Sequence, residues 1–136
     1  MSGIANVRAA LETALNGMSP ALATAWENVA FTPTAGSAYQ RVTFMPATPV
    51  NNEISANYRE EGILQIDLCY PINTGPAAAE ARAELTRSRF RRGTSFASGG
   101  VTTTVSDVPE VHPGRIEGDR YIRQIDVPVF AHVTAT

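Results

Sequence analysis

The segment that decides the fold covers residues 58–96 and reads YREEGILQIDLCYPINTGPAAAEARAELTRSRFRRGTSF. Every second residue from Leu64 to Tyr70 is apolar, which is typical of a half-buried strand. The Pro/Gly turn at 71–75 ends this strand. Pro76 suits the first turn of a helix, because its missing N–H has no partner to lose there. We therefore expect a strand over 58–70, a tight turn and a helix over about 76–91.

The residues of the expected helix suit close packing against a sheet. Its inward side combines small residues with one aromatic residue, namely Ala79, Ala83, Thr86 and Phe90. Glutamates lie near its start and arginines near its end, which matches the helix dipole. Gly93 is expected to end the helix.

The remaining elements follow from two periodicities. Apolar residues recur at helical spacing over 3–16, with Ser2 as a plausible N-cap and Gly17 as a plausible stop. Residues 26–31 form an apolar patch or a short strand. Further β-rich runs lie at 39–45, 101–105 and 120–133. We expect 39–45 to form a hairpin with 58–70, and 101–106 to form one with 120–133.

This order predicts an α+β fold. The sheet is expected to be antiparallel or mixed, with an N-terminal and a central helix packed mainly on one face. A chain of 136 residues has room for one core, so we expect a single domain over residues 1–136. Pro128 interrupts the last strand and cannot donate to a ladder, so it should face an edge or a bulge. The polar stretches 46–57 and 106–119 are expected to be connections.

The composition is that of a soluble globular protein, with 43% hydrophobic and 18% charged residues. No apolar run reaches the roughly 18 residues of a membrane span, and Met1-Ser2-Gly3 does not begin a signal peptide. We therefore expect no membrane partner and a protein that stays in the cytoplasm where it is made. The single cysteine excludes an internal disulfide and a zinc cluster.

The basic residues are eleven arginines and no lysine, in a chain with a net charge of −2. This balance argues against a general nucleic-acid binder, which is usually basic. Arginine is enriched in protein interfaces, where lysine is depleted. A high-GC coding bias produces the same imbalance, so the composition leaves both explanations open.

No residue pattern indicates catalysis, and we expect no catalytic residue, metal ligand or cofactor. His112 and His132 have no second ligand at metal-binding spacing and are interpreted as solvated loop or strand-face residues. Cys69 is interpreted as a packed thiol. Asp67 and Asp126 lie opposite the aliphatic stripes of their strands and are interpreted as solvated or interface-facing acids.

The strongest charged feature surrounds Phe90 at the end of the central helix. It admits a solvated helix end stabilised by the dipole, a contact with acids of a neighbouring subunit, or a contact with DNA phosphates. The interface hypothesis also includes acidic and basic residues elsewhere. Its candidate residues are Arg59, Glu60, Arg87, Arg89, Arg91, Arg92 and Arg115.

Seven segments in this order resemble the tail-terminator-like family of long-tailed bacteriophages. They are IANVRAALETAL, WENVAFTP, YQRVTFMPA, EGILQIDLCYPINTGPAAAEARAEL, FRRGTSF, GGVTTTVSDVPEV and YIRQIDVPVFAHV. The resemblance covers most of the chain and depends on the order and spacing of the segments. It implies a structural virion protein without catalytic residues, located in the tail and present in the host cytoplasm during assembly.

The resemblance further implies a homo-oligomeric ring, a hexamer, that caps the tail tube, stops its polymerisation and provides the head-joining surface. Its partners would be the tail-tube protein and a head-completion or connector protein, and DNA would pass through without specific binding. We expect residues 46–59 and 106–119 to project from the sheet and contact neighbours or the tube.

Two other readings remain open at this point. One is another head–tail completion or tail-tube protein of similar build. The other is a small-ligand binding domain or an enzyme that uses the groove between sheet and helix. Closed rings, open tubes or a solitary subunit would distinguish these readings.

Overall fold

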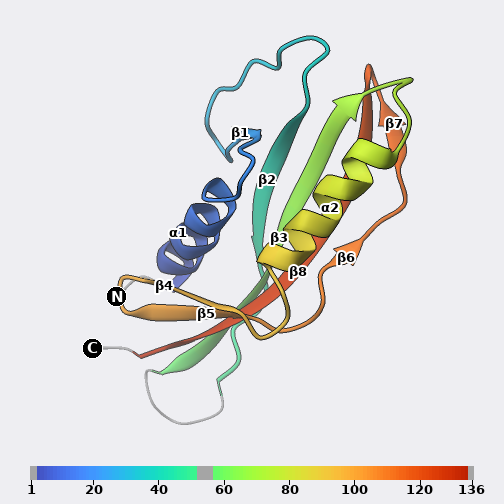
Figure 1. Ribbon diagram of the computed structural model, residues 1–136. Helices are drawn as coiled ribbons and strands as arrows, with labels where there is room; N and C mark the ends of the chain where they lie inside the picture. The colour runs from blue at the N-terminus through green and yellow to red at the C-terminus, as the bar shows by residue number, and fades with distance from the viewer. Residues whose placement is uncertain (1–2, 52–56, 135–136) are drawn as a thin grey trace.

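The computed structural model of this chain describes residues 3–51 and 57–134. Within them it contains two helices and one eight-stranded sheet (Figure 1). The helices are α1 (Gly3–Asn16) and α2 (Ala77–Arg89). The strands are β1 (Ala23–Ala25), β2 (Tyr39–Pro46), β3 (Tyr58–Pro71), β4 (Ser95–Ser98), β5 (Val101–Val105), β6 (Glu110–Val111), β7 (Arg115–Glu117) and β8 (Arg120–Val133).

The sheet is mixed, and its strand order is β1-β2-β3-β8-β5-β4. Only β1 and β2 pair in parallel. β3 and β8 form the longest pairing, from Tyr58 opposite Val133 to Pro71 opposite Arg120. The short strands β6 and β7 pair with the other side of β8, so that β8 is bonded on both sides. The predicted α+β fold is confirmed.

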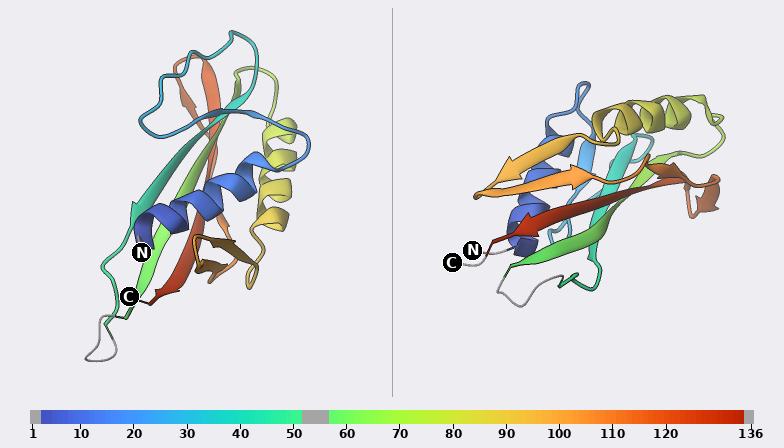
Figure 2. Two further views of the ribbon diagram at one scale, coloured as in Figure 1. Left: turned by 90° about the vertical axis from the view of Figure 1, so that its left-hand side faces the viewer. Right: turned by 90° about the horizontal axis from the view of Figure 1, so that it is seen from below.

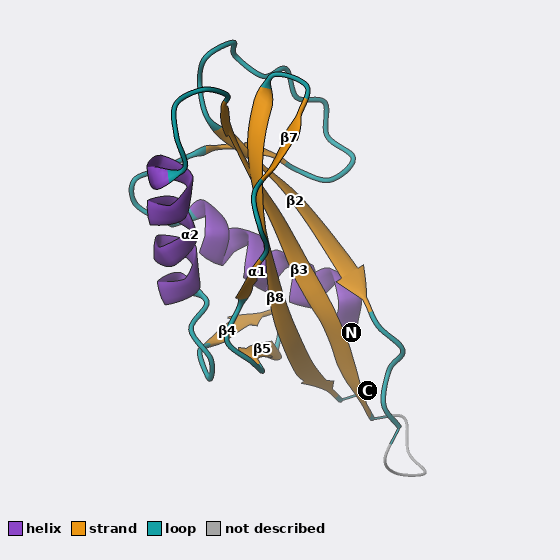
Figure 3. Cartoon of the chain, turned by 90° about the vertical axis from the view of Figure 1, so that its right-hand side faces the viewer, coloured by secondary structure: helices purple, strands orange, loops and turns teal. Residues whose placement is uncertain are grey.

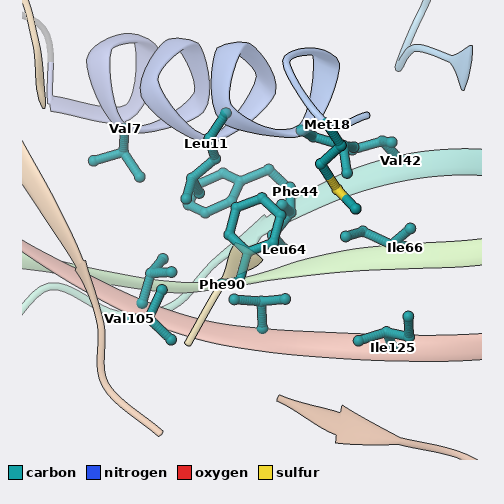
Figure 4. Packing of buried hydrophobic residues seen from close by; sticks show 14 of the residues in the cluster. Val7, Leu11, Met18, Val42, Phe44, Leu64, Ile66, Phe90, Val105 and Ile125 are labelled. Carbon is teal, nitrogen blue, oxygen red and sulfur yellow. The ribbon is translucent and has the colours of Figure 1, made fainter. Parts of the chain in front are cut away.

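The hydrophobic core follows from the alternation in β3 and β8. Leu64, Ile66 and Leu68 are fully buried, as are Ile125 and Val127 in the partner strand. Phe44 and Phe90 meet this layer together with Val7 and Leu11 of α1 (Figure 4). Gly62 makes room for the Phe44 ring, because a Cβ atom at this glycine would lie 2.7 Å from Phe44 Cζ.

Both helices contribute to the same hydrophobic cluster, α1 through four residues and α2 through Ala83. Figure 2 shows that the sheet is curled, with β4 and β5 turned toward α1. The expected packing of both helices mainly on one face stays a prediction, since a curled sheet presents no single flat face. None of the helices in the described residues is long and apolar enough to cross a membrane.

The long elements agree with the predicted bounds, including α1, β2, β5 and β8, and both expected hairpin pairings are present. The expected N-cap Ser2 lies outside the described residues. Pro128 is placed as expected, where the pairing of β5 with β8 has ended. Its carbonyl accepts a hydrogen bond from Ser106 N–H, one residue beyond β5. Because the N–H and C=O of a strand residue point to the same side, the missing N–H of Pro128 faces the end of this ladder.

Several expectations about the connections were wrong. Residues 106–119 are not one projecting loop, because β6 and β7 lie within them and hydrogen-bond to β8. The strands β1 and β4 were not predicted, and residues 26–31, expected to be an apolar patch or a short strand, form a turn and a loop. In the connection over residues 46–57, Ala47 N–H donates to Glu61 O and Val50 forms a β-bridge with Arg59. Residues 52–56 lie outside the described residues.

Candidate interaction surface

The C-terminal part of α2 presents the predicted arginine cluster in two different ways. Arg87 Nε donates to Pro109 O at 3.1 Å, and Arg89 Nε donates to Ala14 O at 3.1 Å. Arg89 also stacks 5.3 Å from the ring centroid of Phe96. These two arginines therefore tie α2 to other parts of the subunit.

Arg91 and Arg92 differ from the arginines that precede them. Both side chains are exposed, and neither pairs with a carboxylate of residues 3–51 or 57–134. The exposed apolar side chain of Val108 lies beside them, together with Pro109. This corner of the subunit can offer two free guanidinium groups to a partner.

A further arginine of α2, Arg82, was missed by the sequence interpretation. Only 6% of it is exposed, and Nη1 donates to Pro20 O. Its Nε and Nη2 are buried without a hydrogen-bond partner among the described residues. Burial lowers the pKa of this guanidinium. A periodicity signal was present, because Arg82 falls between Ala79 and Ala83 on the inward side of the helix.

Arg82 lines a groove between α2 and the segment that follows α1. The groove has a volume of about 410 Å³, and the lining is otherwise mostly apolar: Pro20, Ala21, Leu22, Tyr70, Ala78, Ala81 and Leu85. A second hollow of about 300 Å³ shares Leu85 and extends toward Gly17 and Arg89. We call the two together the Leu85 groove. It combines apolar walls with two arginines that lack acidic partners within the described chain.

The remaining predicted residues lie away from this helix. Arg59 pairs with Glu61 at 3.1 Å and stacks 4.1 Å from the ring centroid of Phe130. Arg115 Nε lies 3.6 Å from a Glu117 carboxylate oxygen. In the sheet Arg59 lies opposite His132 of β8, whereas Arg115 lies opposite Ile122 of the same strand. These two positions of β8 are ten residues, or about 33 Å, apart. The structure therefore does not bring them into one patch.

Glu60 is 3% exposed and points toward the same side as Ala131, its partner across the ladder. Its carboxylate lies beside Gly3, at the beginning of α1. Burial raises the pKa of this carboxyl group. In the isolated subunit Glu60 is thus an interior residue and offers little surface to a neighbour.

The face of β2, β3 and β8 opposite the apolar core has a polar ladder of side chains, and neither α1 nor α2 lies in front of it (Figure 3). Arg41 pairs with Asp67 at 3.3 Å and with Glu117 at 3.5 Å. His112 Nε2 lies 2.8 Å from Asp126 Oδ2. His112, interpreted as a solvated loop or strand-face residue, lies just after β6 and is partly exposed, and its backbone N–H donates to the Gln124 carbonyl of β8.

Asp67 was interpreted as a solvated or interface-facing acid, and it is largely buried in the isolated subunit. Only 7% of it is exposed, although it lies opposite the aliphatic stripe as expected. His132 meets Phe130 edge to face on the same open side of the sheet. Cys69 is fully buried as predicted, and burial raises the pKa of its thiol.

The hairpin between β7 and β8 forms a second apolar feature at one end of the sheet. Ile116 is 72% exposed, the largest value among the exposed large hydrophobic residues of the described chain. A hollow of about 290 Å³ beside it is lined by Ile72, Pro76 and Tyr121, among others. The side chain of Asp119 at the turn is 81% exposed. We call residues 115–120 the hairpin tip.

None of these arrangements resembles a reaction centre. No group of three or more His, Cys, Asp or Glu side chains in the described residues has a geometry that could hold a metal ion. The exposed features are arginines without acidic partners, an apolar groove and an apolar tip. Arginine and exposed apolar side chains are also enriched in protein–protein interfaces.

Comparison with known proteins gives two findings. A family model described as phage tail terminator protein matches residues 6–129. One solved structure is similar with a TM-score of 0.79 at 23% identity, and the match covers 100% of this chain and 99% of that chain. At this identity the structural likeness shows a shared fold. No curated protein matches the chain.

Proposed function

Because this chain belongs to the phage tail terminator family, we propose that it forms a closed ring that caps the tail tube. The family match over residues 6–129 is the observation that carries this proposal. The chain is a structural protein of the phage tail. We propose further that the ring is a hexamer of single-domain subunits, that it stops tube polymerisation and that it presents the head-joining surface.

The surface of the subunit supports a ring built from head-to-tail contacts. Such a ring joins one patch of a subunit to a different patch of the next copy, and closes by rotation. Arg82 and Arg89 of α2, and Arg91 and Arg92 just beyond its end, have no carboxylate partner within the described chain. Exposed acids lie elsewhere, including Asp119 at the hairpin tip. Complementary charges on separate patches favour association in one register.

We assign the predicted interface residues to different tasks within this proposal. Arg91 and Arg92 contact acids of a neighbouring subunit, while Arg87 and Arg89 hold α2 in place. Arg59 and Arg115 serve the open face of the sheet, where the tail-tube protein or the head-completion protein docks. Glu60 acts indirectly, since it is buried beside the start of α1.

The proposed ring is located in the virion tail, after assembly in the host cytoplasm. DNA passes through it without specific binding, in keeping with the net charge of −2. No enzymatic step is part of this role, which the family indicates to be structural.

Electron microscopy of the purified protein, alone and mixed with growing tail tubes, tests the proposal. We expect closed rings and tubes that stop growing once capped. A tube subunit would form open-ended tubes by itself. A protein that binds neither itself nor tube ends would contradict the proposed function.

A further inference from the structure

We propose that the Leu85 groove receives the hairpin tip of a second copy of this chain. In this contact Ile116 packs on the apolar wall near Leu85 and Leu22. The Asp119 carboxylate faces the guanidinium groups of Arg82 and Arg89. This inference rests on the ring proposed above, because it specifies how neighbouring subunits in that ring meet.

The groove combines a buried cation with a partly exposed apolar wall. Arg82 is 94% buried and leaves Nε and Nη2 without an acceptor among the described residues. Buried polar groups without partners are uncommon in folded proteins and destabilise them. The surrounding wall is apolar, with Leu85 37% exposed. An incoming segment with an apolar side chain next to a carboxylate would cover the exposed wall and place its negative charge near the cations that line it.

The hairpin tip has this combination. Ile116 is 72% exposed, and the Asp119 side chain is 81% exposed. The Asp119 carboxylate lies 3.8 Å from Arg120 Nε, a long contact that leaves it available for a second cation. The backbone of the tip is held by the β7–β8 ladder and by Ile72 N–H, which donates to Asp119 O at 3.4 Å. A tip fixed in this way loses little conformational freedom on binding.

The positions of the two features suit a head-to-tail contact. The groove is formed with residues 20–22, which directly precede β1 at one edge of the sheet. The hairpin tip lies beyond β8, on the side of that strand that faces away from β3 and β1. Figure 1 shows β1 and β7 on opposite sides of α2. A subunit can therefore offer its tip on one side and its groove on the other, as a ring requires.

Cysteine cross-linking tests this contact directly. We would introduce Leu85→Cys and Ile116→Cys into one chain and oxidise the assembled protein. A disulfide forms only where Cβ atoms approach to about 3.5–4.5 Å. Native Cys69 is fully buried and so gives no background. We expect covalent multimers that extend up to the closed ring on a denaturing gel, and no multimers from either single variant.

A matched pair supplies the control. Val29 is 60% exposed, and Ile116→Cys combined with Val29→Cys should give no covalent multimers. As a second readout, Leu85→Glu should raise the concentration needed for ring assembly at least tenfold, whereas Val29→Glu should leave it unchanged. Both positions are on the surface of the subunit, so both variants should retain the wild-type melting temperature.

Three results would overturn the inference. Rings that assemble without the Leu85–Ile116 cross-link would reject this contact while leaving the proposed function intact. Covalent dimers from the Ile116→Cys variant alone would show that the tip meets its own copy instead. A protein that stays monomeric, alone and with tail tubes, would reject both this contact and the ring.

Discussion

The arginines at the end of α2 should separate into two classes when each is replaced by alanine. Arg89→Ala removes a hydrogen bond to Ala14 O and a stacking contact with Phe96. Because Arg89 is solvent-exposed, we expect the loss to be about 1–2 kcal/mol of folding free energy. For a chain of this length that corresponds to a fall of about 4–7 °C in melting temperature.

The double variant Arg91→Ala/Arg92→Ala should behave in the opposite way. Neither side chain has an acidic partner within the described subunit, so stability should change by less than about 0.5 kcal/mol. Two lost ion pairs at each subunit contact would weaken it by about 0.5–2 kcal/mol, or roughly 2- to 30-fold. The effect should grow at low salt, where screening is weaker.

Calorimetry and sedimentation velocity on the same preparations separate these effects. Arg91→Lys/Arg92→Lys serves as the matched control, because it keeps both charges while removing the planar guanidinium. Wild-type assembly by the double alanine variant would refute the assignment of Arg91 and Arg92 to a subunit contact. An unchanged melting temperature for Arg89→Ala would refute its assignment to the fold.

Three further predictions concern the subunit itself. Gly62→Ala should lower the free energy of unfolding by about 1–3 kcal/mol, because the added methyl group crowds the Phe44 ring. Phe44→Leu in the same chain should recover part of this loss. If thermal unfolding shows that the losses of the two substitutions simply add, the packing argument is contradicted. The hydrogen bonds that Arg8 and Phe44 N–H donate to Glu27 lower the pKa of its carboxyl group. The ionised carboxylate therefore stabilises the fold above its unfolded pKa of about 4.3. This stabilisation is lost as the pH falls through the lower pKa of the folded state. Glu27→Gln should therefore lower the melting temperature at pH 7 but not at pH 3, and equal losses at both pH values would contradict this assignment. Cys69 should not react with a thiol reagent in the native protein and should react fully in denaturant, because its thiol is buried; labelling of the native protein at the denatured rate would show that it is accessible.

The sequence was sufficient for the elements whose periodicity is set by one buried face. The bounds of α1 and β8 agree with the prediction because α1 has an apolar stripe facing the core and β8 buries every second residue from Ile125 to Val133. β6 and β7 could not be predicted in the same way. They have two and three residues and little burial, and they exist because β8 has backbone groups on its second side that need partners.

The candidate site was predictable only in part. Charge clustering identified Arg91 and Arg92, which are exposed and lack carboxylate partners in the described chain. It could not separate them from Arg89, whose contact with Ala14 joins residues 75 positions apart in the chain. Arg82 remained unnoticed because its importance comes from burial against Pro20, which depends on the path of the chain after α1.

The central position of β8 has a consequence for how the subunit is produced. This strand follows every other strand in the chain, yet β3, β5, β6 and β7 all pair with it. During synthesis the growing polypeptide therefore lacks the middle of its sheet until residues 120–133 have left the ribosome. A fragment that ends before β8 would leave β3, β5, β6 and β7 without their common partner strand and would have no completed sheet.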